Sequence, residues 1–199
     1  MLALPLPPLK PCRFIRRKNR FLVEADVGPL HLANSGRMAE LLLPKAPCFY
    51  HPRATPKTVG RMMLVESQGV LVGVDASMAN GLLEVLLREG FSLLGQGSGP
   101  DPGSVRKEVR LGGERMDFGV RIGGKEALLE AKNCNRVEGG LALFPDAPTA
   151  RGARHLRLLG AFARGGGLAY AVWMVQHPLA QAFALDPEDG PLYRAAREA

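Results

Sequence analysis

Residues 105–134 read VRKEVRLGGERMDFGVRIGGKEALLEAKNC, in which two glycine pairs interrupt runs of alternating apolar and polar side chains. A two-residue Gly-Gly loop between such runs is typical of a tight hairpin, because both turn positions need positive φ. The loops at Gly112-Gly113 and Gly123-Gly124 therefore predict three adjacent antiparallel strands.

Counting outward from each loop gives the expected register of these strands. Beside Gly123-Gly124, the expected pairs are Ile122 with Lys125, Arg121 with Glu126, Phe118 with Leu129 and Asp117 with Glu130. Beside Gly112-Gly113, they are Leu111 with Glu114, Val109 with Met116 and Glu108 with Asp117.

Side chains on these strands alternate between the two faces of the sheet. The expected core face is apolar and consists of Val109, Leu111, Met116, Phe118, Val120, Ile122, Ala127, Leu129 and Ala131. The other face carries Glu108, Asp117, Glu130 and Lys132. Like charges directly opposite one another destabilise a sheet, and a divalent cation would compensate them. We therefore expect Asp117, Glu130 and Glu108 to be metal ligands; a solvated face with ion pairs such as Arg121 with Glu126 is the alternative.

The flanking segments predict helices and one further strand. Residues 80–89 (NGLLEVLLRE) have leucines at helical spacing, with Asn80 as the expected cap and Gly90 as the end. Residues 149–164 predict a second helix, which Asp146 either caps or accompanies as a site residue. Residues 168–175 (LAYAVWMV) contain no polar side chain and predict a strand buried on both faces. The order αβββαβ, with Asp117 followed by Glu130-Ala131-Lys132, is that of the PD-(D/E)xK nuclease superfamily.

The first 79 residues predict a small β-barrel. Short strands are expected at residues 20–25, 29–33, 48–51, 62–67 and 70–74, separated by turn residues. The opening MLALPLPPLKPC is interrupted by prolines and lacks a basic start, so we expect an extended arm and neither a signal peptide nor a membrane span. The glycine-rich stretch at residues 95–100 lacks a following Gly-Lys-Thr/Ser and is expected to be a loop. The expected domains are therefore 1–79 and 80–199.

Composition favours a polyanionic partner, because the 199 residues carry a formal net charge of +7. Three widely spaced cysteines indicate a reduced, cytoplasmic protein. Aromatic residues such as Phe14 and Phe21 lie among the basic ones, a mixture typical of single-strand binding, although aromatics in a barrel more often belong to its core. The expected nucleic-acid-binding residues of the barrel are Arg13, Arg16, Arg17, Lys18, Arg20 and Arg37, with a second basic group at Arg53, Lys57 and Arg61.

Four motifs resemble the sugar fermentation stimulation protein family, SfsA. They are residues 34–38 (NSGRM), 115–118 (RMDF), 130–132 (EAK) and 144–156 (FPDAPTARGARHL). The resemblance spans nearly the whole chain and implies an N-terminal OB-type barrel, a C-terminal PD-(D/E)xK-type domain and DNA binding. The chain departs from the family pattern at Ser35, Glu114 and Ala131, where the family usually has Thr, Ser and Val.

The chemistry expected from these residues is metal-assisted hydrolysis of a phosphodiester. Asp117 and Glu130 would hold Mg²⁺ or Mn²⁺, and Lys132 would orient the attacking water or stabilise developing charge. Arg151 and His155, four residues apart on one helix face, would grip a phosphate; a plain helix surface with a satisfied histidine is the alternative.

Two further functions stay open from the sequence. One is a DNA-binding regulator of sugar-utilisation genes with a vestigial catalytic site, and the other is a metal-dependent enzyme acting on a small phosphorylated substrate. Neither a helix-turn-helix nor a zinc-finger pattern occurs in the sequence, so DNA contacts are expected mainly to the backbone.

Overall fold

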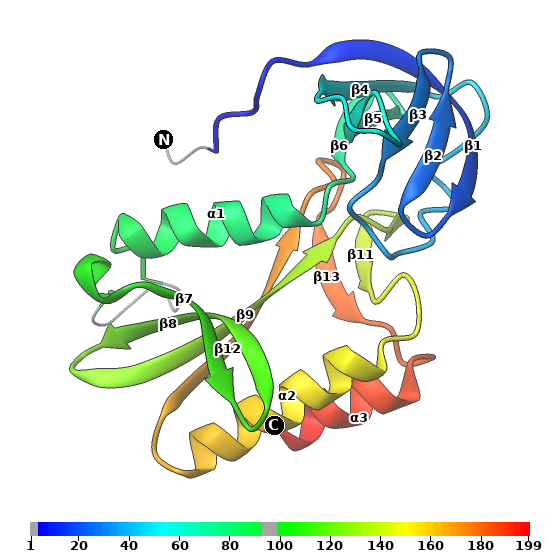
Figure 1. Ribbon diagram of the computed structural model, residues 1–199. Coiled ribbons are helices and arrows are strands. Elements are labelled where there is room, and N and C mark those ends of the chain that lie inside the picture. Colours follow the sequence, from blue (N-terminus) through cyan, green and yellow to red (C-terminus); the bar gives the residue numbers. More distant parts are fainter. Residues whose placement is uncertain (1–3, 93–98) are drawn as a thin grey trace.

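The computed structural model describes residues 4–92 and 99–199, and Figure 1 shows a β-barrel lobe beside a mixed α/β lobe. Most of the glycine-rich loop expected at residues 95–100, and the first three residues of the expected arm, lie outside the described residues. No helix in the described part of the chain is long and apolar enough to cross a membrane.

Six strands build the barrel lobe. They are β1 (Lys10–Asn19), β2 (Leu22–Ala25), β3 (Gly28–His31), β4 (Pro47–Pro52), β5 (Gly60–Ser67) and β6 (Val70–Gly73). Their order is β3-β2-β1-β4-β5-β6, and a parallel pairing of β3 with β5 closes the barrel. The predicted barrel is therefore confirmed.

The sequence prediction missed β1, the longest strand of the barrel. Its basic side chains point outward, whereas Cys12 and Phe14 are buried in the barrel core. The many charged residues in this segment obscure the alternation of buried and exposed side chains. The predictions that residues 10–12 belong to an extended arm and that the first strand begins at Arg20 are therefore wrong.

The second lobe contains the predicted αβββαβ order with additional elements. Its helices are α1 (Ser77–Arg88), α2 (Ala150–Arg164) and α3 (Gly190–Glu198), with a short 3-10 helix at Pro102–Ser104. Its strands are β7 (Arg106–Leu111), β8 (Glu114–Ile122), β9 (Lys125–Cys134), β10 (Val137–Glu138), β11 (Leu141–Phe144), β12 (Leu168–Val175) and β13 (Ala182–Leu185). The main sheet has the order β12-β9-β8-β7, and β10, β11 and β13 form a smaller sheet.

Both glycine pairs form the predicted hairpin turns. Their φ angles are 54° and 83° at Gly112-Gly113, and 57° and 79° at Gly123-Gly124. The ladders place Val109 opposite Met116 and Phe118 opposite Leu129, as the register predicts. Two glycines thus fix each register locally.

The expectation of a single core face is wrong, because the sheet is covered on both faces. Phe118 and Leu129 pack with α1, whereas Met116 and Leu128 pack with α2. Met116 and Phe118 are two residues apart yet face opposite ways, so β8 changes face at Asp117. Its neighbour β7 changes face at Glu108, whose φ is +53°. Because of these irregularities, the α2 side of β9 contributes to a second core, whereas the sequence predicts no core on the face that carries the acids.

Three further expectations are corrected at the ends and edges of elements. Helix α1 begins at Ser77, so Asn80 lies inside the helix and is not its cap. Helix α2 is capped by Thr149, whose Oγ1 accepts a hydrogen bond from Gly152 N at 3.0 Å, and not by Asp146. Strand β12 lies at the edge of its sheet and is only partly buried.

The two lobes are joined by hydrogen bonds at the base of the barrel. Gly73 N donates to Gln176 O at 3.2 Å, and Asn135 Nδ2 donates to Gly73 O at 3.2 Å. The Met38 amide of the barrel donates to Asp146 Oδ2 at 2.5 Å. These contacts hold the loop at residues 34–38 against the second lobe.

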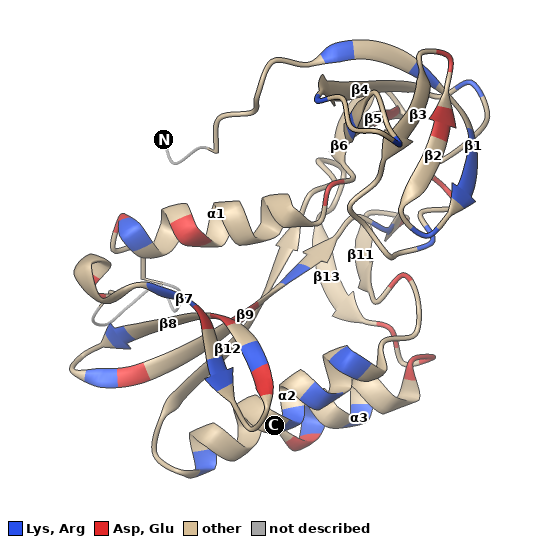
Figure 2. Cartoon of the chain, in the orientation of Figure 1, with Lys and Arg blue, Asp and Glu red and all other residues tan. Residues whose placement is uncertain are grey.

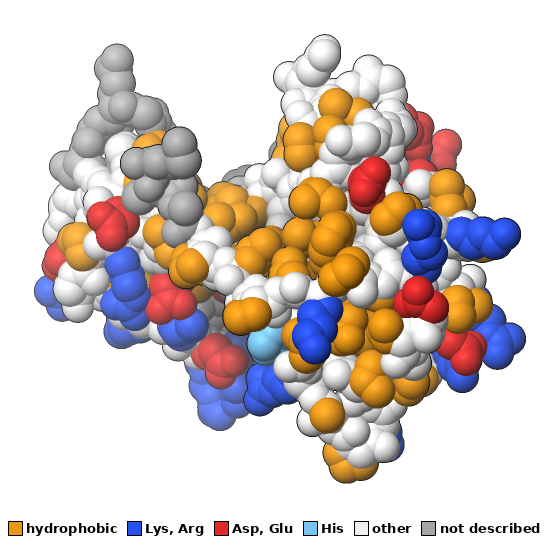
Figure 3. All heavy atoms as spheres, turned by 90° about the horizontal axis from the view of Figure 1, so that it is seen from above, with side chains coloured by type: hydrophobic (Ala, Val, Ile, Leu, Met, Phe, Trp, Pro, Cys, Tyr) orange, Lys and Arg blue, Asp and Glu red, His pale blue; other side chains and the backbone are white. Residues whose placement is uncertain are grey.

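Seen from above, hydrophobic side chains gather over the middle of the molecule, and basic side chains lie toward its margins (Figure 3).

Candidate active site

A cavity of about 440 Å³ lies between the barrel and the second lobe. Strand β9 contributes Glu130 and Lys132, and β8 contributes Asp117. The start of α2 contributes Arg151, and the barrel contributes Arg20 together with the loop at residues 34–36. Polar groups from both lobes therefore surround one space.

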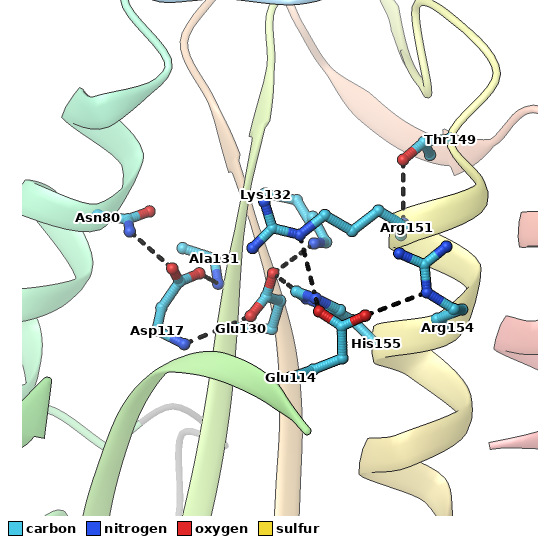
Figure 4. A network of polar contacts seen from close by, with 11 residues as sticks. Asn80, Glu114, Asp117, Glu130, Ala131, Lys132, Thr149, Arg151, Arg154 and His155 are labelled. Atoms are coloured by element: carbon cyan, nitrogen blue, oxygen red, sulfur yellow. Dashed lines mark hydrogen bonds and ion pairs between the residues drawn. The ribbon is translucent and has the colours of Figure 1, made fainter. Parts of the chain in front are cut away.

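Asp117 lies where β8 changes face, and its side chain accepts a hydrogen bond from the backbone of the neighbouring strand β9. Its Oδ2 accepts a hydrogen bond from Ala131 N at 2.8 Å, and its Oδ1 accepts one from Asn80 Nδ2 at 2.9 Å. Its own backbone amide donates to Glu130 Oε2 at 3.3 Å. The two carboxylates therefore lie close together on neighbouring strands (Figure 4).

Glu130 is buried, and two nitrogen groups contact its Oε1. Lys132 Nζ lies 2.7 Å away and His155 Nδ1 lies 2.6 Å away. Burial by itself would raise the pKa of Glu130, but the His155 hydrogen bond and the Lys132 charge outweigh it, so the pKa lies below its ordinary value. Glu130 is therefore held as a carboxylate by its neighbours.

Asp117 has the opposite balance. Burial raises the pKa of its carboxyl, and the nearby charge of Glu130 raises it further. Hydrogen bonds from Ala131 and Asn80 and the Lys132 charge act against this rise without cancelling it. The neighbours of Glu130 thus compensate its charge, whereas those of Asp117 compensate its charge only in part.

His155 lies beneath the cavity and not on its surface, because its side chain is only 1% exposed. Arg151 Nε donates to its Nε2 at 3.2 Å, and this bond requires the proton on Nδ1, where it is donated to Glu130. With that tautomer, Nε2 cannot also donate to Glu114 Oε2, which lies 3.4 Å away. His155 therefore connects Arg151 to Glu130, while the exposed Arg151 lines the cavity.

The loop at residues 34–38 brings the barrel to the site. A side chain at Gly36 would place its Cβ 2.7 Å from Asp146 Oδ2, so only glycine allows this approach. Arg17 holds the same loop, donating from Nη1 to Gly36 O at 2.5 Å and from Nη2 to Asn34 O at 2.8 Å. Asp146 thus joins the site by fixing this loop, and burial raises the pKa of its carboxyl.

Of the six basic barrel residues predicted to bind nucleic acid, the structure brings only Arg20 to the cavity. Arg16 and Lys18 are exposed on β1 and pair with Glu24 at 2.8 Å and 3.4 Å. Arg13 and Arg37 are also exposed, whereas Arg17 is partly buried and bonded to backbone carbonyls. Figure 2 shows that basic residues also line α2.

Glu108, the predicted third ligand, is not brought to the cavity. Its side chain is 71% exposed and pairs with Arg115 Nη1 at 2.9 Å. The positive φ at Glu108 turns β7 at this residue. Register placed Glu108 beside Asp117, but local backbone geometry decided where its side chain lies.

Two residues of the site escaped the sequence reasoning. Asn80 orients Asp117 through a hydrogen bond. The sequence indicates this role only in that Asn80 is a polar residue on the same helix face as the buried Leu83 and Leu87. Glu114 contacts His155 and also pairs with Arg154 Nε at 3.1 Å. No sequence pattern placed Glu114 there, because the contact depends on how α2 packs on the sheet.

The donor set fits a hard divalent cation that keeps several waters. In the described part of the chain, no three His, Cys, Asp or Glu side chains converge as a complete metal site. Asp117 and Glu130 do line one cavity, and Mg²⁺ is commonly held by one or two carboxylates with water and substrate as the other ligands. Asp117 and Glu130 are the residues that would hold it.

Comparisons with known proteins agree with this architecture. Residues 15–74 match the SfsA N-terminal OB domain, and residues 77–199 match the sugar fermentation stimulation protein RE domain. The sugar fermentation stimulation protein homolog of Chloroflexus aggregans is 38% identical, over 96% of this chain and 75% of that one. The homolog of Moorella thermoacetica is 36% identical, over 100% of this chain and 88% of that one.

A solved structure is also similar over the full length of this chain. It is that of Pyrococcus furiosus SfsA in complex with Ca²⁺, with a TM-score of 0.86 and 28% identity, covering 100% of this chain and 87% of that one. The fold is thus an OB barrel followed by a restriction-endonuclease-like domain. The chain belongs to the sugar fermentation stimulation protein family, SfsA.

Proposed function

We propose that this protein binds DNA and hydrolyses phosphodiesters at a divalent-metal site formed by Asp117 and Glu130. The observation that carries the proposal is the pair of carboxylates at one cavity, with Lys132 and Arg151 as cations beside them. The Ca²⁺ complex of the Pyrococcus furiosus protein supports a divalent ion in this family. Mg²⁺ or Mn²⁺ is the proposed cofactor.

Each side chain has a distinct proposed role. When bound, the cation would neutralise phosphate charge and help to activate water. Lys132 would stabilise the negative charge that develops on the phosphate, because its ammonium group lies at the cavity beside Glu130. Arg151 would bind a phosphate oxygen through the part of its guanidinium that His155 does not contact. His155 would position Glu130 and Arg151 without touching the substrate.

DNA contact is proposed to be mainly with the phosphate backbone. The exposed basic residues of β1 and Arg20 lie on the barrel, and Arg151 at the start of α2 lines the cavity from the other lobe. Cations spread over such a surface neutralise phosphates without reading bases. We propose the barrel, residues 1–79, as the main binding unit and residues 80–199 as the catalytic unit.

A second candidate is a DNA-binding regulator whose site no longer cleaves. One observation favours it: each oxygen of Asp117 and Glu130 already has a hydrogen-bond donor within the chain. The metal-free site is therefore internally satisfied, with Lys132 paired to Glu130.

One experiment separates the two candidates. Purified protein is incubated with labelled single-stranded, duplex and branched DNA, with Mg²⁺, Mn²⁺, Ca²⁺ or a chelator. The nuclease proposal expects cleavage with Mg²⁺ or Mn²⁺ that Asp117→Asn abolishes. Binding without cleavage in every metal would favour the regulator, and absence of binding would contradict both.

A further inference from the structure

We infer that a second cavity, on the barrel, binds a single-stranded segment of nucleic acid and leads it past Arg20 into the cavity at Asp117. This inference rests on the proposed function, because it names the form of nucleic acid that the site receives. The second cavity measures about 470 Å³. It lies among the β1–β2 turn, the end of β3 and the β4–β5 loop, and its lining includes Phe21, Arg53, Lys57 and Arg61.

Phe21 gives this cavity a surface suited to a base. Its side chain is 47% exposed, so it lies at the cavity and outside the barrel core formed around Phe14 and Leu30. An exposed ring beside a cavity offers a flat apolar face, and base stacking on such rings contributes without regard to base identity. The bases of a duplex are already stacked on each other, so this contact favours an unpaired strand.

Two cations at the cavity are free to bind phosphates. Arg53 and Lys57 are exposed, and neither has an ion-pair partner within residues 4–92 and 99–199. Arg61 differs, because its Nη2 donates to the buried Asp75 at 2.6 Å and to Ser77 at 2.7 Å. We therefore assign phosphate binding to Arg53 and Lys57, and a structural role to Arg61.

Arg20 connects the two cavities. Its guanidinium carbon lies 5.8 Å from the centre of the Phe21 ring, while its side chain lines the cavity that contains Lys132. The β1–β2 turn that carries Arg20 is held in place by Arg17, whose Nη2 donates to Arg20 O at 2.7 Å. A strand whose base stacks on Phe21 would thus meet Arg20 next and then the carboxylates. The substrate class that fits is a single-stranded end or flap.

The binding test uses a fluorescein-labelled 20-nucleotide oligothymidylate and a labelled duplex of the same length, titrated with protein in a chelator so that no cleavage occurs. Phe21→Ala should weaken single-strand binding about tenfold and duplex binding by much less. Phe91→Ala is the matched control, because Phe91 is also exposed, at 50%, but lies at the end of α1. Phe21→Trp should restore affinity, and oligonucleotide should quench its emission, whereas Phe91→Trp should be unaffected.

The charge test uses the double variant Arg53→Ala with Lys57→Ala. Removing two phosphate contacts should lower the slope of log affinity against log salt by about 1.4 for a single strand. Arg121→Ala with Lys125→Ala, exposed at the tip of the β8–β9 hairpin, is the control of equal charge and should change the slope less.

The outcomes separate this inference from the proposed nuclease activity. If Phe21→Ala and Phe91→Ala bind the single strand alike while both remain folded, or if Phe21→Trp is not quenched, the second cavity is not a strand-binding site. If these variants behave as expected but the parent cleaves nothing with Mg²⁺ or Mn²⁺, the nuclease proposal fails and the strand-binding inference stands.

Discussion

Glu130 Oε1 lies 2.6 Å from His155 Nδ1, whereas Glu130 Oε2 accepts a hydrogen bond from the backbone amide of Asp117 at 3.3 Å. The two oxygens of one carboxylate are therefore held from α2 on one side and from β8 on the other. Glu130 cannot turn without breaking one of these contacts, so its direction toward the cavity is fixed before any ion binds.

Asp117→Asn should leave the metal-free protein as stable as the parent or more stable. The substitution removes a like-charge contact that costs about 0.2 to 1 kcal/mol, and the Asn80 amide can rotate to present its oxygen to the new amide. Thermal denaturation in a chelator measures this. Mg²⁺ or Mn²⁺ should raise the melting temperature of the parent by mass action and that of the variant little.

The same variant predicts a pH dependence. Because the folded-state pKa of Asp117 is raised above its ordinary 3.8, the folded protein binds more protons than the unfolded chain between these two values. Stability of the metal-free parent should therefore fall, relative to Asp117→Asn, as pH rises from about 4 through the raised pKa, and the difference should then level off. A destabilisation of the variant by several kcal/mol at neutral pH would instead make Asp117 part of a structural hydrogen-bond network.

Lys132→Met should separate turnover from metal binding. The ammonium group pairs with the buried Glu130 carboxylate, so its loss should destabilise the metal-free protein by about 1.5 to 3 kcal/mol. The melting-temperature shift produced by Mg²⁺ should be at least as large as in the parent, because the cation can replace the lost charge, while cleavage is lost. A variant that loses the metal-induced shift as well would show that Lys132 is needed to hold the site and not only for turnover.

Arg151→Ala and His155→Ala should differ in stability although both side chains belong to one network. Arg151 is exposed, so its removal should change the free energy of unfolding by less than about 0.5 kcal/mol while lowering activity. His155 is buried, and its removal takes away one of the two donors to the buried Glu130 Oε1, which should cost about 1 to 3 kcal/mol. Urea denaturation compares them, with exposed Arg154→Ala as control; equal losses for Arg151→Ala and His155→Ala would contradict the assignment.

Neighbouring basic residues of β1 should also differ in their effects. Arg16→Ala with Lys18→Ala should weaken binding to all DNA sequences alike and reduce the salt slope by about 1.4 to 1.8, because both side chains are exposed. Arg17→Ala should mainly lower the melting temperature, since it leaves the carbonyls of Asn34 and Gly36 without their donor. A salt slope unchanged in the first variant would remove β1 from the DNA-binding surface.

Local sequence determined the hairpins, their register and the placement of Asp117 beside Glu130. Glycine pairs with positive φ and the alternation of side chains depend only on residues close together in the chain, so the strand register can be obtained by counting residues from each turn. The same is true of α2 and of the apolar strand β12, whose limits were predicted within one residue.

Tertiary structure alone decided which face is buried, where Glu108 points and what surrounds the carboxylates. The change of face at Asp117 is compatible with the local pattern, and only packing of α1 and α2 on opposite faces selects it. The contacts of Asn80 with Asp117, of His155 with Glu130 and of Asp146 with Met38 join residues 37, 25 and 108 positions apart. Such contacts depend on the docking of whole elements, which periodicity and spacing in one sequence do not specify.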